Sequence, residues 1–163
     1  MKSLLADFTG HAIYVDTMMP YMLLRDMNED VERFFLQIRR GDFIAYTSVL
    51  TFDELAYRLV LAFIKERYGG SPLDHLRRKE SQMMGEFSGM VATLLRRLRE
   101  LPHLVVLDVL SSDLDMLNEA MTLYRLRSRD ALHLAAMHRV GCFDLASTDA
   151  HFDAVPYIRR FSL

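Results

Sequence analysis

Four carboxylates stand where short apolar segments of the sequence meet helical ones. Asp16 directly follows the apolar segment AIYV, and Asp149 follows the segment DLAST. Glu54 lies early in a helical stretch, and Asp130 opens the helical run DALHLAAM. Each acid alone is explained as a turn former, a helix-start residue or a solvated helix acid. Together they predict one acidic site, because the strand ends and helix starts of a parallel sheet meet at one edge.

Such a cluster needs a cation. Carboxylates held close together repel one another and raise each other's pKa, so the empty cluster lowers stability. Mg²⁺ and Mn²⁺ prefer carboxylate and water oxygens over sulfur or imidazole. One or two such ions can hold a phosphodiester, lower the pKa of a water and stabilise the leaving oxygen. The four acids therefore predict metal-dependent phosphodiester hydrolysis.

Histidines and arginines near these acids are weaker candidates. His133 lies three positions after Asp130, and a packed or hydrogen-bonded role is favoured over metal binding or general-base catalysis. His151 is favoured as a turn residue. Arg127 and Arg129 flank the start of the helix that bears Asp130, so they are the preferred candidates for contacting substrate phosphates.

The elements that must position these residues alternate between short strands and longer helices. This alternation predicts a three-layer α/β/α fold with a mostly parallel central sheet of four to five strands. The expected strands cover residues 12–15, 43–47, 104–107, 143–146 and, as a fifth, 158–162.

Helix boundaries follow from capping residues and glycines. Asn28 is expected to cap a helix that ends at Gly41, and Ser48 to cap a long helix that the sequence GGSP ends. Ser128 is expected to cap the helix that contains Asp130. A further helical stretch at about 70–101 is interpreted as an insertion or clip within a single domain of residues 1–163.

Composition narrows the class of protein. The 163 residues are 51% hydrophobic and 26% charged, which suits one folded domain. The net charge of -2 provides no overall basic field for nucleic acid. Cys142 is the only cysteine, so neither an internal disulfide nor a cysteine-rich zinc site is expected. No signal peptide is evident, and the apolar run Leu59–Ile64 is too short to span a bilayer. A cytoplasmic location without membrane attachment is expected.

Four stretches, in order, resemble the motifs of PIN-domain ribonucleases. They are AIYVDTMM, TSVLTFDELAYRL, LRSRDALHLAAMHRVGC and DLASTDAHFDAVPYI, of which the last two are the more specific. The resemblance covers Ala12 to about Phe161. The long helical segment between residues 70 and 100 departs from the compact toxins of this family.

The resemblance implies a PIN-like fold and cleavage of RNA with Mg²⁺ or Mn²⁺. The implied metal-binding and catalytic residues are Asp16, Glu54, Asp130 and Asp149, with Asp153 as a secondary metal ligand. Thr17, Thr148, Arg127 and Arg129 are the implied or expected contacts to substrate. The family further implies the toxin of a VapBC-type toxin–antitoxin pair, with an antitoxin protein across the site, and a homodimer.

Two other functions stay open on these residues. One is a catalytically inactive PIN-like scaffold that binds a partner protein. The other is an aspartyl-phosphate phosphatase with Asp16 as nucleophile. Such phosphatases usually carry a second aspartate two residues later, where this chain has Met18.

Overall fold

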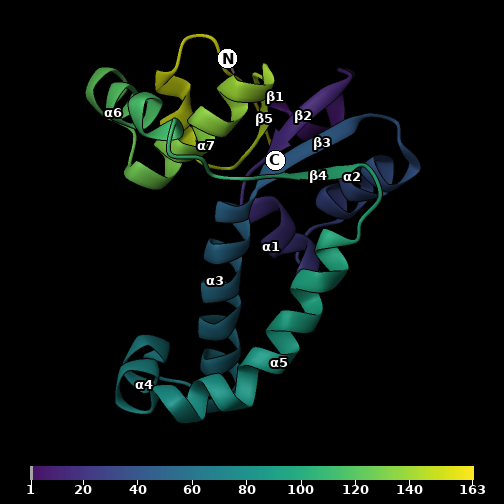
Figure 1. Cartoon of the computed structure of the whole chain (residues 1–163). Helices are drawn as coiled ribbons and strands as arrows, with labels where there is room; N and C mark the ends of the chain where they lie inside the picture. The colour runs from purple at the N-terminus through teal and green to yellow at the C-terminus, as the bar shows by residue number, and fades with distance from the viewer. Residues whose placement is uncertain (1) are drawn as a thin grey trace.

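The computed structural model describes residues 2–163 and has a six-stranded, all-parallel sheet at its centre (Figure 1). The strands lie in the order β1-β6-β5-β2-β3-β4. Their bounds are β1 Lys2–Leu4, β2 Ala12–Val15, β3 Ile44–Ser48, β4 Leu104–Leu107, β5 Asp144–Ala146 and β6 Arg159–Ser162.

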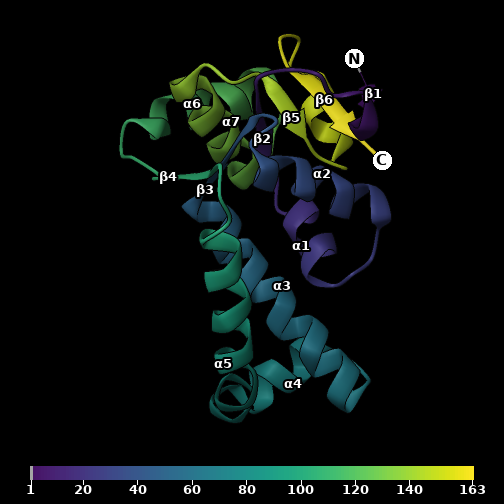
Figure 2. The ribbon, with the colours of Figure 1, turned by 90° about the vertical axis from the view of Figure 1, so that its right-hand side faces the viewer.

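Helices cover both faces of this sheet, which gives the three layers expected from the sequence (Figures 1 and 2). They are α1 Met18–Leu24, α2 Glu29–Arg40, α3 Val49–Tyr68, α4 Pro72–Arg78, α5 Glu80–Arg99, α6 Asp113–Leu123 and α7 Ser128–Val140, with 3₁₀ helices η1 Leu5–Asp7 and η2 Ala150–Ala154. One apolar core joins α1, α2, α3 and α5 to one face, and a second core joins α6 and α7 to the other.

Strand β2 contributes side chains to both cores. Ile13 and Val15 belong to the core beside α1 and α2, whereas Tyr14 belongs to the core beside α7. This alternation follows from the two-residue period of a strand. It also brings Tyr14 to the face that carries the helix of Asp130.

The predicted strands are confirmed, with small shifts at their ends. The strands at 12–15 and 104–107 have the expected bounds, and the other three differ by one residue. The sheet has one strand more than the four to five expected. The additional strand, β1, is only three residues long and pairs with β6 alone, so it carries too little pattern to be recognised in the sequence.

The caps of α2 are confirmed. The Asn28 side chain accepts hydrogen bonds from the backbone N–H groups of Asp30, at 2.9 Å, and Val31, at 3.1 Å. Gly41 ends the helix with a φ of 81°, a conformation that favours glycine. Ser48 does precede α3, but its side chain makes no capping hydrogen bond.

The predicted cap at Ser128 is wrong by one residue. Arg127 is the extended residue before α7, with φ -67° and ψ 157°, and Ser128 is already helical. Because the side chain of Arg127 does not cap the helix, the first turn of α7 begins without the usual short polar acceptor.

Helices α3, α4 and α5 form an arm that extends away from the sheet, with α4 at its far end (Figures 1 and 2). The two long helices pack through apolar side chains, including Phe63 and Phe87, whose ring centroids are 6.4 Å apart. The helical stretch expected at about 70–101 is two helices, separated at Lys79. Its interpretation as an insertion within a single domain stays a prediction.

Across residues 2–163, we find no helix that combines the length and the apolar character needed to cross a bilayer.

The Asn28 cap gives a test of the fold. Asn28→Ala is expected to lower the free energy of unfolding by about 1 kcal/mol, because two backbone N–H groups lose their acceptor. The midpoint of thermal unfolding should fall by about 2–4 °C for a domain of this size. Asn28→Ser, which keeps a capping oxygen, is the matched control and should recover most of the loss. Equal midpoints for Asn28→Ala and wild type would contradict the assignment of this cap.

Candidate active site

The four acids converge on one cavity at the carboxyl edge of the sheet. Asp16 follows β2, Glu54 lies in the second turn of α3 after β3, Asp130 lies in the first turn of α7, and Asp149 follows β5. Strands β3, β2 and β5 are parallel neighbours, so their carboxyl ends lie at the same edge. The cavity has a volume of about 320 Å³. Its lining residues are Asp16, Thr17, Met18, Glu54, Arg58, Arg127, Ser128, Arg129, Asp130 and Asp149.

Asp16 is the most firmly held of the acids. Its side chain is buried, and its Oδ1 accepts a hydrogen bond of 2.7 Å from the backbone N–H of Thr17. Its Oδ2 accepts a bond of 2.6 Å from the hydroxyl of Ser147, whose oxygen in turn accepts from the backbone N–H of Asp149 at 3.0 Å. Ser147 therefore ties the segments after β2 and β5 together. Ser147 was not predicted, although its position between a strand and Asp149 was the available signal.

Glu54 is held by Thr17 and faces His133. Its Oε2 accepts a hydrogen bond of 2.9 Å from the Thr17 hydroxyl, and its Oε1 lies 3.5 Å from Nε2 of His133. Burial acts to raise the pKa of Glu54, but His133 and the Thr17 hydroxyl stabilise the carboxylate more strongly, and the pKa falls below its usual value. The hydroxyl of Thr17, expected to contact substrate, is thus engaged with Glu54.

Asp130 has the opposite electrostatic balance. Burial, followed by the charges of Asp149 and Asp16, raises its pKa above the usual value for an aspartate. Within the described residues, its Oδ2 is buried and has no hydrogen-bond partner. The raised pKa thus reflects first the burial of the carboxyl and then its acidic neighbours.

The negative charge of Asp149 is stabilised by its neighbours. Burial acts to raise its pKa, but the backbone N–H and ring of His151, with the charge of Arg127, outweigh that effect and lower it. The His151 backbone N–H donates to Oδ1 at 2.9 Å, and its ring Nδ1 lies 2.7 Å from the same oxygen. The turn role expected for His151 agrees with this geometry.

Three arginines line the cavity beside the acids. Arg127 and Arg129 are there as expected, and Nη2 of Arg129 lies 3.5 Å from Oδ2 of Asp53. Arg58 was missed by the sequence analysis. It lies four residues after Glu54 on α3, and this spacing puts both on one helix face, which was the available signal.

Two expected residues lie outside the lining of the cavity. Thr148 is exposed and does not line it. Asp153 receives two hydrogen bonds of 2.7 Å from Arg160, which also donates to the backbone carbonyl of Ser147 at 3.2 Å. Asp153 is therefore linked to the site indirectly, because Arg160 bonds both Asp153 and the carbonyl of Ser147. A ligand role for Asp153 and a substrate contact for Thr148 stay predictions.

The donor set fits a hard, hydrated cation. The oxygens Glu54 Oε1 and Asp130 Oδ2 are buried acceptors with no hydrogen-bond partner among residues 2–163. In that same part of the chain, no three Asp, Glu, His or Cys side chains are arranged to hold an ion directly. Mg²⁺ usually keeps several waters and is bound through one or two carboxylates, so this arrangement suits it. It does not suit zinc, which takes four close ligands.

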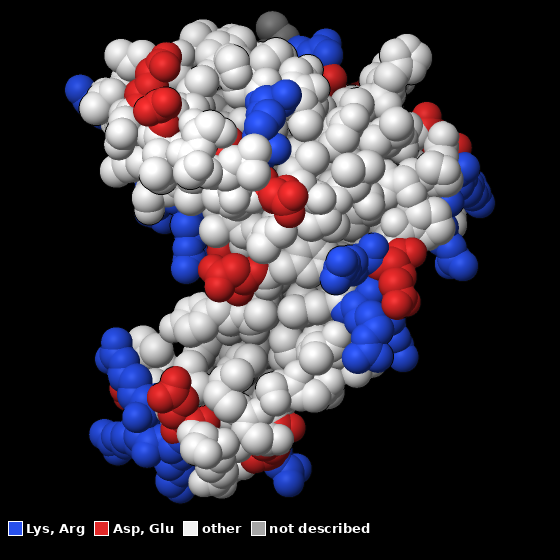
Figure 3. Space-filling model, in the orientation of Figure 1, with Lys and Arg blue, Asp and Glu red and all other residues white. Residues whose placement is uncertain are grey.

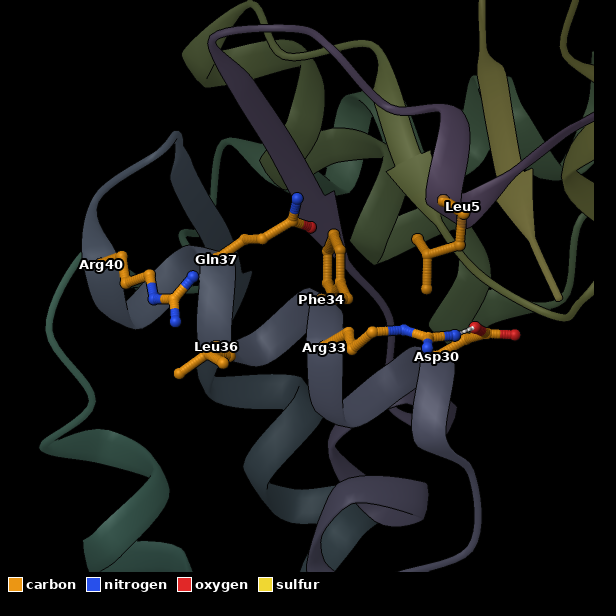
Figure 4. Close-up of a pocket in the computed structure, with 8 residues that line it drawn as sticks. Leu5, Asp30, Arg33, Phe34, Leu36, Gln37 and Arg40 are labelled. Atoms are coloured by element: carbon orange, nitrogen blue, oxygen red, sulfur yellow. Dashed lines mark hydrogen bonds and ion pairs between the residues drawn. The ribbon is translucent and has the colours of Figure 1, made fainter.

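The face in Figure 3 is hollowed between the body and the arm, with acidic and basic side chains on both edges. A separate cavity of about 360 Å³ lies between η1 and α2 (Figure 4). Its lining includes Arg40 and the Arg33–Asp30 ion pair but no group of converging acids. The candidate active site is therefore the cavity of the four acids.

Solved structures of similar fold include two DNA complexes and a toxin. VapBC2 of Rickettsia felis, bound to a DNA fragment from its promoter, matches with a TM-score of 0.63 and 10% identity over 93% of this chain and 98% of that chain. VapC20 of Mycobacterium tuberculosis, a toxin that cleaves the sarcin–ricin loop, has a TM-score of 0.58 and 15% identity over 90% and 96% of the two chains. FitAB bound to an IR36 DNA fragment has a TM-score of 0.55 and 18% identity over 92% and 94%.

At these identities the structural similarity establishes the fold alone. No curated protein matches the sequence. The family model of the PIN domain, however, matches residues 13–157, a span that contains all four acids of the cavity. The chain therefore belongs to the PIN domain family.

Proposed function

We propose that this protein is a Mg²⁺- or Mn²⁺-dependent ribonuclease that hydrolyses phosphodiester bonds in RNA. The observation that carries the proposal is the meeting of Asp16, Glu54, Asp130 and Asp149 at one cavity. Burial, followed by repulsion from Asp149 and Asp16, raises the pKa of Asp130, and a divalent cation would relieve the repulsion. Membership of the PIN domain family supports a nuclease, and the resemblance of the four motifs to PIN-domain ribonucleases supports RNA as the substrate.

Asp16 and Asp149 are the main anchors for the cation, and Glu54 and Asp130 complete the site or orient the attacking water. Such an ion supplies a lower pKa for that water and charge stabilisation for the phosphate oxygens. The chain's own contribution is to hold the acids in place. Ser147 and the Thr17 backbone fix Asp16, and the Thr17 hydroxyl fixes Glu54.

The arginines at the rim serve the substrate. Arg58, Arg127 and Arg129 line the same cavity as the acids, and guanidinium groups bind phosphate oxygens well. We assign to them the backbone phosphates next to the cleaved bond. Contacts of this kind position the RNA and carry no information on its sequence.

An inactive scaffold is the second candidate, since no three Asp, Glu, His or Cys side chains among residues 2–163 are placed to bind an ion directly. It predicts that calorimetry detects no uptake of millimolar Mn²⁺. The aspartyl-phosphate phosphatase has no observation in its favour, because Met18 lines the cavity where a second aspartate would stand.

We propose further that the protein is a cytoplasmic toxin, acts with an antitoxin protein and forms a homodimer. Its solved structural neighbours include VapBC2 and FitAB, each bound to DNA, and a toxin that cleaves the sarcin–ricin loop. Co-expression with a small open reading frame beside its gene is expected to yield a stable complex. Size-exclusion chromatography with light scattering measures both stoichiometries. A monomer at all concentrations would contradict the homodimer, and two separate peaks would contradict the antitoxin.

Loss of the first acid tests the site directly. Asp16→Asn is expected to lower metal-dependent RNA cleavage by about 100-fold or more, because a charge worth several kcal/mol to the reaction is removed. The fold should persist, since the amide oxygen can still accept from the Thr17 backbone. Cleavage of a labelled single-stranded RNA with Mn²⁺ measures the effect. Asp42→Asn, on an exposed residue before β3 at the other edge of the sheet, is the matched control and should cleave normally. Full activity of Asp16→Asn, purified free of other nucleases, would refute the assignment.

The repulsion at Asp130 predicts opposite effects with and without metal. The folded pKa of Asp130 is raised, so its ionisation weakens the fold as the pH rises through that pKa. In EDTA at pH 7, Asp130→Asn is therefore expected to raise the midpoint of thermal unfolding, by about 2–4 °C for each kcal/mol of repulsion removed. The difference should shrink as the pH falls toward about 4, where carboxyls of ordinary pKa become protonated.

Added Mn²⁺ should then stabilise wild type more than Asp130→Asn, because the variant has lost one ligand. Differential scanning fluorimetry across pH, with and without metal, measures both effects. A variant less stable than wild type in EDTA would show that Asp130 is not repelled by its neighbours.

A further inference from the structure

A buried histidine lies behind the acids of the site. His133, one helical turn after Asp130 on α7, is 1% exposed. Its Nδ1 lies 2.8 Å from the hydroxyl oxygen of Tyr14 on β2, which is fully buried. Its Nε2 lies 3.5 Å from Oε1 of Glu54 and 3.9 Å from Oδ1 of Asp16. The imidazole thus bridges a buried phenol and two carboxylates of the site.

The carboxylates beside Nε2 favour one arrangement of the contact with Tyr14, in which the hydroxyl donates to Nδ1. Tyr14 is fully buried, and its hydroxyl has a single proton to donate. In this arrangement Nδ1 of His133 accepts the hydrogen bond, and Nε2 carries an N–H. The opposite tautomer would direct the Nε2 lone pair at two carboxylates, which is repulsive.

The proton on Nε2 faces Oε1 of Glu54, an oxygen that can still accept a hydrogen bond. Among the described residues, Glu54 Oε1 and His133 Nε2 are both buried polar atoms without a hydrogen-bond partner. Their separation of 3.5 Å exceeds a normal N–H···O bond, as is common at catalytic sites before the substrate complex forms. With Thr17 on its other oxygen, Glu54 is flanked by a donor on each side.

Direct metal binding by His133 is disfavoured. No group of three His, Cys, Asp or Glu side chains among residues 2–163 is arranged to hold an ion, and this includes the ring of His133 with Glu54 and Asp16. Mg²⁺ and Mn²⁺ also prefer oxygen ligands to imidazole. A role through the carboxylates remains, and outer contacts of this kind commonly orient metal ligands.

We propose that Tyr14 and His133 form a buried positioning pair, in which the Tyr14 hydroxyl fixes the His133 tautomer and the Nε2–H orients Glu54 and Asp16. The pair rests on the proposed function, because its purpose is to hold carboxylates for a divalent cation. Neither residue lines the cavity, so neither contacts substrate.

The tautomer is tested on the metal-free protein by ¹⁵N NMR of the histidine rings. Wild type is expected to show His133 with Nε2 protonated and Nδ1 bare, and to keep this pattern when Mg²⁺ is added. Tyr14→Phe, which removes only the hydroxyl, should lose the fixed tautomer. An Nδ1–H ring in wild type would overturn the proposal, and so would loss of the Nε2 proton on adding Mg²⁺, since His133 would then be a ligand.

Kinetics and metal titration test the consequence. Tyr14→Phe and His133→Leu are each expected to lower kcat and to weaken Mn²⁺ binding by about 10–100-fold. The thermal stabilisation that Mn²⁺ causes measures its binding. The KM for RNA should stay unchanged. His133→Gln, whose amide can still donate toward Glu54, should recover part of the loss. His138→Gln, on an exposed histidine of the same helix, is the matched control and should behave like wild type.

These outcomes separate the two proposals. Active wild type with an equally active, equally metal-binding Tyr14→Phe would overturn the positioning pair and leave the ribonuclease assignment standing. A wild type that binds no Mn²⁺ and cleaves no RNA would overturn the proposed function, and the positioning role with it.

Discussion

Repulsion among four carboxylates at one sheet edge is the interaction around which the rest of the site is arranged. Three of the acids have their own compensation. Asp16 accepts from the Thr17 backbone and Ser147, Glu54 accepts from the Thr17 hydroxyl, and Asp149 accepts from His151. Asp130 has no such donor to its buried Oδ2 within the described chain, and it is the acid whose pKa is raised. Burial and the charges of Asp149 and Asp16 therefore act together on this one carboxyl.

The parallel sheet makes this concentration unavoidable. Neighbouring parallel strands send their carboxyl ends to the same edge, and the helices that follow begin there. Two apolar cores, one on each face, fix the sheet between α1–α2 and α6–α7, so the edge cannot open to separate the charges. Behind it, buried Arg160 joins Asp153 to the Ser147 carbonyl and steadies the segment that holds Asp16. Stability of the cores thus compensates for the electrostatic cost of the site.

Local sequence patterns were sufficient for most of this architecture. The apolar runs of β2 and β4 and the Asn28 and Gly41 caps depend on residues close in the chain, and these predictions are confirmed. The meeting of the four acids followed from the parallel order of the strands alone. Their role as metal ligands stays a proposal.

What the sequence did not reveal depends on partners distant in the chain. Strand β1 exists because β6 offers it an edge. Their register pairs Ser3 with Phe161, which is 158 residues later in the chain. Ser147 gains its importance only from a contact with Asp16, and Asp153 is diverted by Arg160. The expected cap at Ser128 failed because the turn before α7 is set by the extended Arg127. Such features are properties of tertiary packing and leave no periodic signal.

The length of helix α3 has a consequence for how this protein can diverge. Glu54 lies near its start and Tyr68 at its end, and fourteen residues of helix separate them by about 20 Å. Insertions, deletions or new surface chemistry in α4, which contains no buried residue, can accumulate across generations without shifting a single acidic oxygen. The distal end is thus free to diversify under selection, while the chemical centre stays constant.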